Sequence, residues 1–258
     1  MAKTKIEWCD RTWNPVSGCT KVSEGCKNCY AERMHTRLEH IKRSGYDDGK
    51  PHFSIRLHPE RLEEPLKWKK PQRVFVGSMG DLFHAEVPFE FIDRIIFRAA
   101  SNPQHTFLFL TKRPKRMLFH FTQHPFGKIW NLEKLKHLWF GVSVENQQTA
   151  DERIPVLLQI PAAKRFLSIE PLLEPVDLRL SERWCSQTST AHDCDLKKDH
   201  INWVILGGEP GPKARPMDVE WARSVMRQCK AANVPFFMKQ MSKKASITED
   251  LMVRELPE

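Results

Sequence analysis

Residues 138–144 read Leu-Trp-Phe-Gly-Val-Ser-Val, an apolar run with a single polar side chain. A strand that is apolar at consecutive positions is typical of a parallel sheet, because helices cover both faces of such a sheet. Runs of the same kind occur at residues 74–78, 106–111, 165–170, 203–209 and 234–239, and a shorter one near 13–17 precedes them. The stretch 138–144 is therefore predicted to be one of six or seven parallel strands.

Amphipathic stretches lie between these runs. Two of them place apolar side chains on one helical face, namely Ile92, Ile95, Ile96 and Ala99 in the first and Ala222, Val225, Met226 and Cys229 in the second. Asp218 is placed to cap the second helix, and another helix is expected from Tyr30. This alternation predicts an α/β protein with a partial TIM-like (β/α) barrel of six to seven parallel strands. The 258 residues suffice for one such domain over residues 1–258.

A polar insert near residues 181–201 interrupts the pattern. It carries Cys185, His192, Cys194 and His200. Their spacing lacks the paired C-x2-C of a zinc knuckle, so a solvent-facing loop is the preferred interpretation, and zinc or an auxiliary cluster is the alternative. The chain has no apolar run long enough to span a bilayer and starts with no signal peptide. A cytoplasmic protein with reduced thiols is expected.

Nearly every predicted strand ends in polar or glycine residues. In a parallel α/β barrel the functional site lies at the carboxyl ends of the strands, where the loops converge. The polar residues expected to meet there include Ser78, Asp81, Thr111, Lys112, Arg113, Ser143, Glu145, Glu170, Glu209 and Lys239. The sequence thus predicts a polar cavity above an apolar core.

Three cysteines, Cys19, Cys26 and Cys29, lie close together in residues 13–31, which read Trp-Asn-Pro-Val-Ser-Gly-Cys-Thr-Lys-Val-Ser-Glu-Gly-Cys-Lys-Asn-Cys-Tyr-Ala. Three thiolates can hold a 4Fe–4S cluster and leave one iron open to a small molecule. With Cys9 as a fourth ligand, they can instead hold structural zinc. The cysteines alone leave both readings open. The polar strand ends favour the cluster, because a zinc ribbon needs no such scaffold.

This cysteine pattern resembles the radical S-adenosylmethionine (SAM) superfamily, and more closely a phage-associated three-cysteine branch of unknown function. The closer resemblance extends over most of the chain, including Gly-Ser-Met-x-Asp-Leu-Phe, Leu-Thr-Lys-Arg-Pro, Glu-Pro-Leu-Leu-Glu-Pro and Gly-Gly-Glu. Cys19 and Cys26 are separated by six residues instead of the superfamily's three, a departure that the branch shares. Gly18 and Gly25 are expected to supply the tight turns that this longer loop needs.

The resemblance implies an enzyme whose 4Fe–4S cluster is held by Cys19, Cys26 and Cys29, and whose cofactor is SAM. It implies that the cluster is reduced by a protein such as flavodoxin or ferredoxin, and that a radical made from SAM abstracts hydrogen from a substrate. The cofactor-binding residues that it implies are Gly77, Ser78 and Asp81 for the SAM amine, Ser143 and Glu145 for the ribose or carboxylate, and Thr111, with Lys112 and Arg113, for the carboxylate or a substrate phosphate.

No catalytic residue is identified, and the candidates that face substrate are Glu170, Glu209, Arg215 and Lys239. For each of them the alternative is an ion pair that closes the top of the barrel. The triplet Gly207-Gly208-Glu209 has the same residue types as the superfamily's amine-binding segment. However, it follows the sixth strand, whereas that segment follows the second. It is expected to form a wall of the cavity, where glycine allows close backbone approach.

The net charge of +9 favours a polyanionic substrate, a nucleic acid or nucleotide. Lysines and arginines at residues 67–73 and 112–116 are expected to meet phosphates, and Trp68 either stacks on a base or packs in the core. The alternative function is a non-enzymatic, zinc-dependent nucleic-acid-binding protein with Cys9, Cys19, Cys26 and Cys29 as ligands. The acidic strand ends argue against it, because a phosphate-binding surface should not carry many carboxylates.

Overall fold

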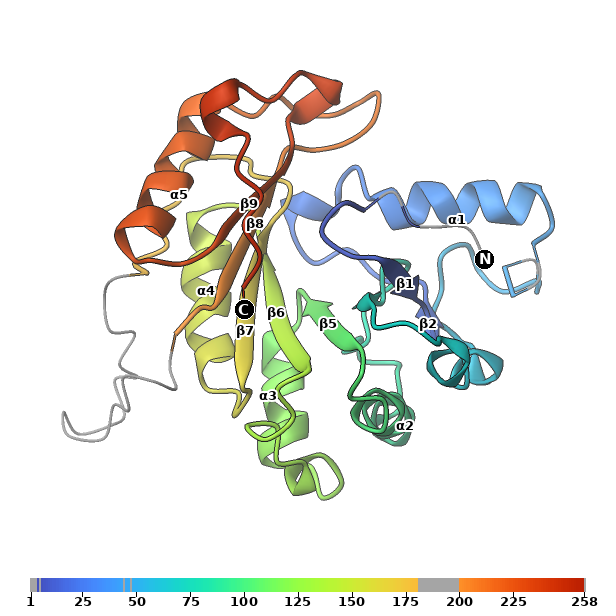
Figure 1. Cartoon of the computed structure of the whole chain (residues 1–258). Helices are drawn as coiled ribbons and strands as arrows, with labels where there is room; N and C mark the ends of the chain where they lie inside the picture. The colour runs from blue at the N-terminus through green and yellow to red at the C-terminus, as the bar shows by residue number, and fades with distance from the viewer. Residues whose placement is uncertain (1–3, 5, 44, 47, 181–199, 258) are drawn as a thin grey trace.

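Seven parallel strands form one sheet in this computed structural model, which describes residues 4, 6–43, 45–46, 48–180 and 200–257. The strands lie in the order β1-β4-β5-β6-β7-β8-β9, and the sheet curls into a half-barrel (Figure 1). Their bounds are β1 Arg11–Trp13, β4 Arg73–Val76, β5 Thr106–Thr111, β6 Leu138–Val144, β7 Lys164–Ile169, β8 Trp203–Gly207 and β9 Phe236–Gln240. The predicted α/β fold, a partial TIM-like barrel, is confirmed.

The helices connect successive strands. They are α1 Tyr30–His40, α2 Phe89–Ala100, α3 Pro114–Thr122, α4 Gln147–Leu158 and α5 Val219–Ala231. Short 3-10 helices occur at η1 Glu24–Cys26, η2 Pro59–Arg61, η3 Pro65–Lys67, η4 Gly127–Ile129, η5 Ser242–Lys244 and η6 Glu249–Leu251. The side chain of Asp218 accepts a hydrogen bond from the backbone of Glu220, so the predicted cap of α5 is confirmed. Cys229 is buried on this helix, as expected of a core residue.

Both faces of the sheet are apolar, which explains the uninterrupted runs in the sequence. On β5 and β6, Phe107, Phe109 and Phe140 belong to the large core shared with the helices. The alternate side chains point to the inner face, where they form a second apolar cluster of Trp8, Cys9, Leu108, Trp139, Phe166, Trp203, Ile205 and Phe237. The Trp8 ring lies 4.8 Å from that of Phe75, so the N-terminal segment closes the inside of the half-barrel.

The first predicted strand, near residues 13–17, is divided in two. Its beginning belongs to β1, whereas β2 (Val16–Ser17) pairs antiparallel with β3 (Arg56–Leu57) in a separate small sheet. The division falls at Pro15, which has no N–H to continue the ladder of the main sheet. Among the described residues, none of the helices combines the length and apolarity needed to cross a membrane.

Candidate active site at the carboxyl ends of the strands

A cavity of about 450 Å³ opens at the carboxyl ends of the strands. Its lining brings together the three cysteines and most of the predicted residues, namely Cys19, Cys26, Cys29, Gly77, Ser78, Asp81, Thr111, Lys112, Arg113, Ser143, Glu170, Glu209 and Lys239. Ile6, Trp8, Phe75 and Leu110 supply its apolar part. Two predicted residues, Glu145 and Arg215, are not part of the lining. Parallel strands in register explain why residues so far apart in sequence converge here.

The two glycines of the cysteine loop have different roles. Gly18 has φ +88°, and a Cβ at this position would lie 1.9 Å from the carbonyl oxygen of Ser54. Glycine is therefore required at this position, but Gly18 lies in a β-bridge with Gly80 and not in the predicted tight turn. Gly25 has no positive φ, but a Cβ there would lie 2.4 Å from Cγ of Glu145. Gly25 lies in the 3-10 turn η1, which is closed by a 2.9 Å hydrogen bond from Cys26 N to Ser23 O, so the predicted tight turn is present, and the close packing against Glu145 requires glycine.

Positive charges border the cysteines. Nη1 of Arg113 lies 3.3 Å from Sγ of Cys19. Burial and the nearby Asp81 raise the pKa of the Cys19 thiol to about 11, although Arg113 acts in the opposite sense. Burial also tends to raise the pKa of Cys26, but the charge of Lys112 and hydrogen bonds from the loop backbone outweigh it and lower that pKa. The cations therefore favour the thiolate at Cys26 only, and they place positive charge beside the cysteine loop.

The sulfur positions bear on the choice between cluster and zinc. Tetrahedral zinc, with bonds of about 2.3 Å, would bring its sulfurs to about 3.8 Å from one another. Within the described part of the chain, the groups of three possible ligands that lie within 4.8 Å of one another do not include the cysteines. Cys9 belongs to the inner apolar cluster, and burial raises its pKa to about 12. The four sulfurs that the zinc alternative requires are not assembled.

Asp81 holds the ends of β4 and β5 together. Its carboxylate accepts four hydrogen bonds, from Thr111 Oγ1 at 2.7 Å, Arg113 Nη1 at 2.9 Å, Phe83 N at 3.0 Å and Lys112 N at 3.2 Å. A carboxylate offers about four acceptor sites. Asp81 therefore has little capacity left for the SAM amine, and it positions Arg113 beside Cys19 instead.

Glu145 attaches the cysteine loop to the end of β6. It is fully buried and forms ion pairs with Lys112 and, at 3.1 Å, with Arg153 of α4. The hydroxyl of Ser23 donates to it at 3.0 Å, and Gly25 packs against it. Burial alone would raise the pKa of Glu145, but the two cations hold that pKa below its usual value. Sequence reasoning missed Arg153, which lies within a helix and has no pattern that marks it.

Glu209 and Arg215 hold the other side of the same loop. Glu209 accepts from the Arg215 side chain at 2.6 and 3.0 Å and from Nδ2 of Asn28 at 2.9 Å. Arg215 also donates to the carbonyl oxygen of Glu24 at 2.9 Å. Burial opposes ionisation of Glu209, but hydrogen bonds from Arg215 lower its pKa to about 2. Both residues thus form an ion pair at the top of the barrel, and Asn28 is a further loop contact that sequence reasoning missed.

Glu170 and Lys239 face the cavity without contacting the cysteine loop. Nζ of Lys239 lies 2.5 and 2.7 Å from the two carboxylate oxygens of Glu170. Ser143 and Ser168, on the neighbouring strands β6 and β7, also line the cavity. This pair and the two hydroxyls are therefore polar groups that remain available to a ligand.

The basic residues do not form one phosphate-binding surface, contrary to expectation. Trp68 is buried and packs beneath the guanidinium of Arg11, which lies 5.0 Å from its ring, so the stacking alternative is wrong. The lysines at 67–70 precede the amino end of β4, whereas the cavity lies at the carboxyl ends. Lys112 and Arg113 are engaged with Glu145 and Asp81.

The polar insert stays largely untested. Cys185, His192 and Cys194 lie outside the described residues. His200 is exposed, and its ring lies 2.7 Å from the side-chain nitrogen of Asn202.

The fold and site define an α/β half-barrel whose cavity carries a three-cysteine loop. The chain belongs to the family described as "Protein of unknown function (DUF5131)", whose model matches residues 3–255. No curated protein matches it.

Among solved structures, the chain is similar to a spore photoproduct lyase complexed with dinucleoside spore photoproduct, at 12% identity and a TM-score of 0.49. The match covers 88% of this chain and 62% of that one. A mutant of spore photoproduct lyase matches at 11% identity with a TM-score of 0.49, over 90% of this chain and 64% of the other. The chain thus spans less than two thirds of the length of these structures.

Proposed function

We propose that this chain is a radical SAM enzyme that holds a 4Fe–4S cluster through Cys19, Cys26 and Cys29. The observation that carries the proposal is the position of these three thiols, which line the same cavity as the polar strand ends and lie beside Lys112 and Arg113. When bound, the cluster supplies an electron that cleaves SAM, and the resulting radical abstracts hydrogen from the substrate. The chain's own residues bind, orient and shield these groups.

Each set of cavity residues has a role in this proposal. Trp8, Phe75 and Leu110 form the apolar part of the lining and exclude water from the reacting groups. The segment from Gly77 to Ser78, together with Ser143, offers hydrogen-bonding groups to SAM. Asp81, Glu145 and Glu209 are positioning residues, because they hold the cysteine loop through Arg113, Ser23 and Asn28.

Glu170 and Lys239 are the residues that we propose face the substrate. Their ion pair offers an acid and a base in one place, which suits proton transfer to or from a bound molecule. An external reductant such as flavodoxin or ferredoxin is part of the proposal, because reductive cleavage of SAM would consume one electron.

Release of 5′-deoxyadenosine from SAM tests this function. The reconstituted protein with dithionite is expected to release it slowly even without substrate. Ser143→Leu places a larger side chain in the cavity at a cost of about 1–3 kcal/mol, so SAM should bind roughly 5- to 150-fold more weakly while the iron content stays unchanged. The control is Ser101→Leu, at an exposed position after α2. A radical SAM function is contradicted if SAM does not change the electron paramagnetic resonance spectrum of the cluster and no 5′-deoxyadenosine is released.

A polyanionic substrate, a nucleic acid or nucleotide, is the substrate class that the net charge of +9 supports. The loops that line the cavity also carry exposed lysines, called loop lysines below: Lys21, Lys27 and Lys213. They replace Lys112 and Arg113 as the candidate phosphate contacts. Lys21 pairs with Glu32 at 3.2 Å, but this ion pair is exposed and contributes little to stability. A cavity of this size admits a single base, so a duplex would have to open and single strands should bind better.

Changing the three loop lysines to Gln should weaken binding to labelled single-stranded DNA and RNA. Because three phosphate contacts are lost, the negative slope of log K against log salt should become shallower by about 2. The matched control changes Lys67, Lys69 and Lys70 to Gln, which removes the same charge at the opposite end of the barrel. An equal effect of both variants, or no binding at low salt, would direct the search to peptides or small molecules.

A further inference from the structure

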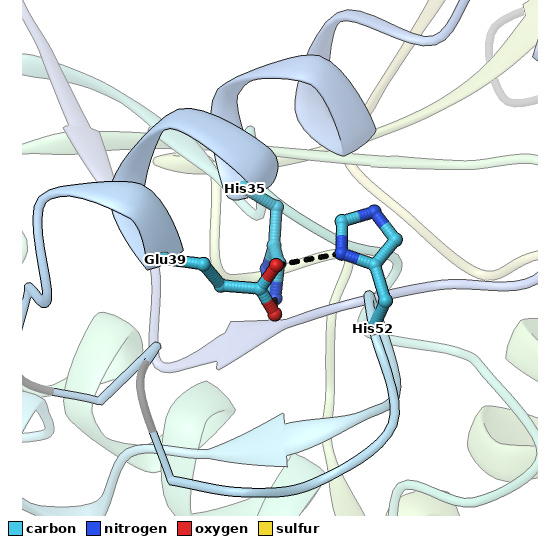
Figure 2. Close-up of side chains that lie close together, drawn as sticks. All are labelled: His35, Glu39 and His52. Carbon is cyan, nitrogen blue, oxygen red and sulfur yellow. Dashed lines mark hydrogen bonds and ion pairs between the residues drawn. The ribbon is translucent and has the colours of Figure 1, made fainter.

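Two groups of histidine and carboxylate side chains lie outside the cavity, with ligand atoms all within 4.8 Å of one another in the described part of the chain. The first consists of His35, Glu39 and His52 (Figure 2). Glu39 lies between the two rings, with ring nitrogens at 3.0 Å in His35 and 2.7 Å in His52, and the guanidinium of Arg56 lies 3.8 Å away. Its carboxylate is satisfied and Arg56 opposes a further positive charge, so this group joins α1 to the following segment without a metal.

The second group, Asp93, His120 and His124, differs because four of its polar atoms are buried without partners, whereas in the first group Nδ1 of His35 is such an atom. Oδ2 of Asp93, both ring nitrogens of His120 and Nδ1 of His124 are buried without a hydrogen bond. Nε2 of His120 lies 3.3 Å from Oδ1 of Asp93, but not in hydrogen-bonding geometry. Each unpaired buried polar atom costs about 1–3 kcal/mol, and such atoms in native proteins usually meet an ion or a water. Four unpaired buried polar atoms in one place therefore require an explanation.

The separations suit a zinc ion. With bonds of about 2.0–2.2 Å, tetrahedral zinc holds neighbouring ligand atoms about 3.3–3.6 Å apart. Oδ1 of Asp93, the oxygen that Trp130 contacts, lies 3.3 Å from Nε2 of His120, and one ligand atom from each of the three residues lies within 4.8 Å of the others. His120 lies in α3 and His124 lies just beyond its end, and the centroids of the two rings are 5.7 Å apart. Modest movement of these side chains would bring all three ligand atoms to bonding distance from one zinc ion.

Neighbouring residues already orient the three ligands. Nε1 of Trp130 donates to Oδ1 of Asp93 at 3.0 Å, which leaves Oδ2 free. The Phe89 ring stacks on that of His120 at 5.3 Å and lies 4.3 Å from that of His124. Such outer contacts are typical of metal sites.

We propose that Asp93, His120 and His124 bind a zinc ion that joins α2 to the end of α3. Asp93 and Trp130 line a separate cavity of about 380 Å³, through which an ion can reach the site from solvent. Three protein ligands leave the fourth position of tetrahedral zinc to a water from this cavity. The site shares none of its ligands with the cysteine loop, so it stands independently of the proposed iron–sulfur cluster.

Zinc binding to the full-length chain tests the proposal, in a background with Cys19, Cys26 and Cys29 changed to Ala so that no thiolate of the loop contributes. One zinc per chain is expected, together with a rise in the melting temperature. Asp93→Asn keeps an acceptor for Trp130 but should abolish binding, as should His124→Gln. Trp130→Phe removes only the orienting hydrogen bond and should weaken zinc binding about 10- to 100-fold. His52→Ala, in the other histidine group, should leave binding unchanged.

Circular dichroism of each variant separates lost binding from lost folding. If the His124→Gln variant fails to fold, zinc binding by the Asp93→Asn and Trp130→Phe variants tests the proposal. A folded chain that takes up no zinc overturns the proposal. Zinc uptake that is unchanged in both Asp93→Asn and Trp130→Phe, or that depends on His52, overturns it as well.

Discussion

Iron uptake is expected to fall from about four irons per chain to almost none when Cys19, Cys26 or Cys29 is changed to Ala. Each thiolate holds one iron of a three-cysteine cluster, and all three thiols line one cavity, so the loss of any one leaves two ligands. Cys9→Ala should take up iron normally, because Cys9 lies in the inner apolar cluster. The measurement is iron and sulfide content after anaerobic reconstitution, together with the brown absorption of the cluster.

Cys229→Ala provides the matched control, since this cysteine is buried in the core face of α5 and belongs to no site. Stoichiometric zinc that depends on Cys9 would contradict the cluster and favour the zinc-dependent nucleic-acid-binding alternative. Iron that survives each single cysteine change would mean that the loop is not the site of the cluster.

Glu145→Ala is expected to lower the free energy of unfolding by about 3–5 kcal/mol, because breaking a buried ion pair leaves an uncompensated charge. Glu145 is fully buried, and the side chain of its partner Arg153 is only 6% exposed. The same change removes the acceptor of Ser23, so the cysteine loop loosens and iron uptake should fall too. Urea unfolding of the metal-free chain measures the first effect, and iron content measures the second.

The control for Glu145 is Asp250→Ala, which breaks an ion pair with Arg223 that lies on the surface. Its effect should be far smaller, since exposed ion pairs contribute little to stability. A Glu145→Ala protein with normal stability and iron content, but weakened SAM binding, would contradict the anchoring role. It would restore the sequence-based interpretation, in which Glu145 contacts SAM.

Much of the fold could be predicted because burial on both faces leaves a direct trace in the sequence. The run at 138–144 coincides with β6, and the run at 106–111 coincides with β5. A parallel strand that is buried on both faces has no solvent-facing positions, so its apolar run is continuous and its ends are marked by polar residues. The convergence of those ends at one cavity then follows from parallel topology alone.

The role of each polar residue could not be predicted in this way. A carboxylate at a strand end looks the same whether it faces a ligand or a neighbouring cation. Glu145 contacts Ser23, which is 122 residues away in the sequence, and Glu209 contacts Asn28 at a separation of 181. No local pattern encodes such pairs, because they depend on how the loops fold over the finished barrel.

The sequence by itself determined the half-barrel and the set of three cysteines, since hydrophobic periodicity and clustered thiols are local properties of the chain. Only the tertiary structure decided that Trp68 packs in the core and that Asp81 and Glu145 hold the cysteine loop. It alone brought Asp93 to His120 and His124. The physical reason is that burial and charge pairing are set by contacts between distant segments, which exist only once the chain has folded.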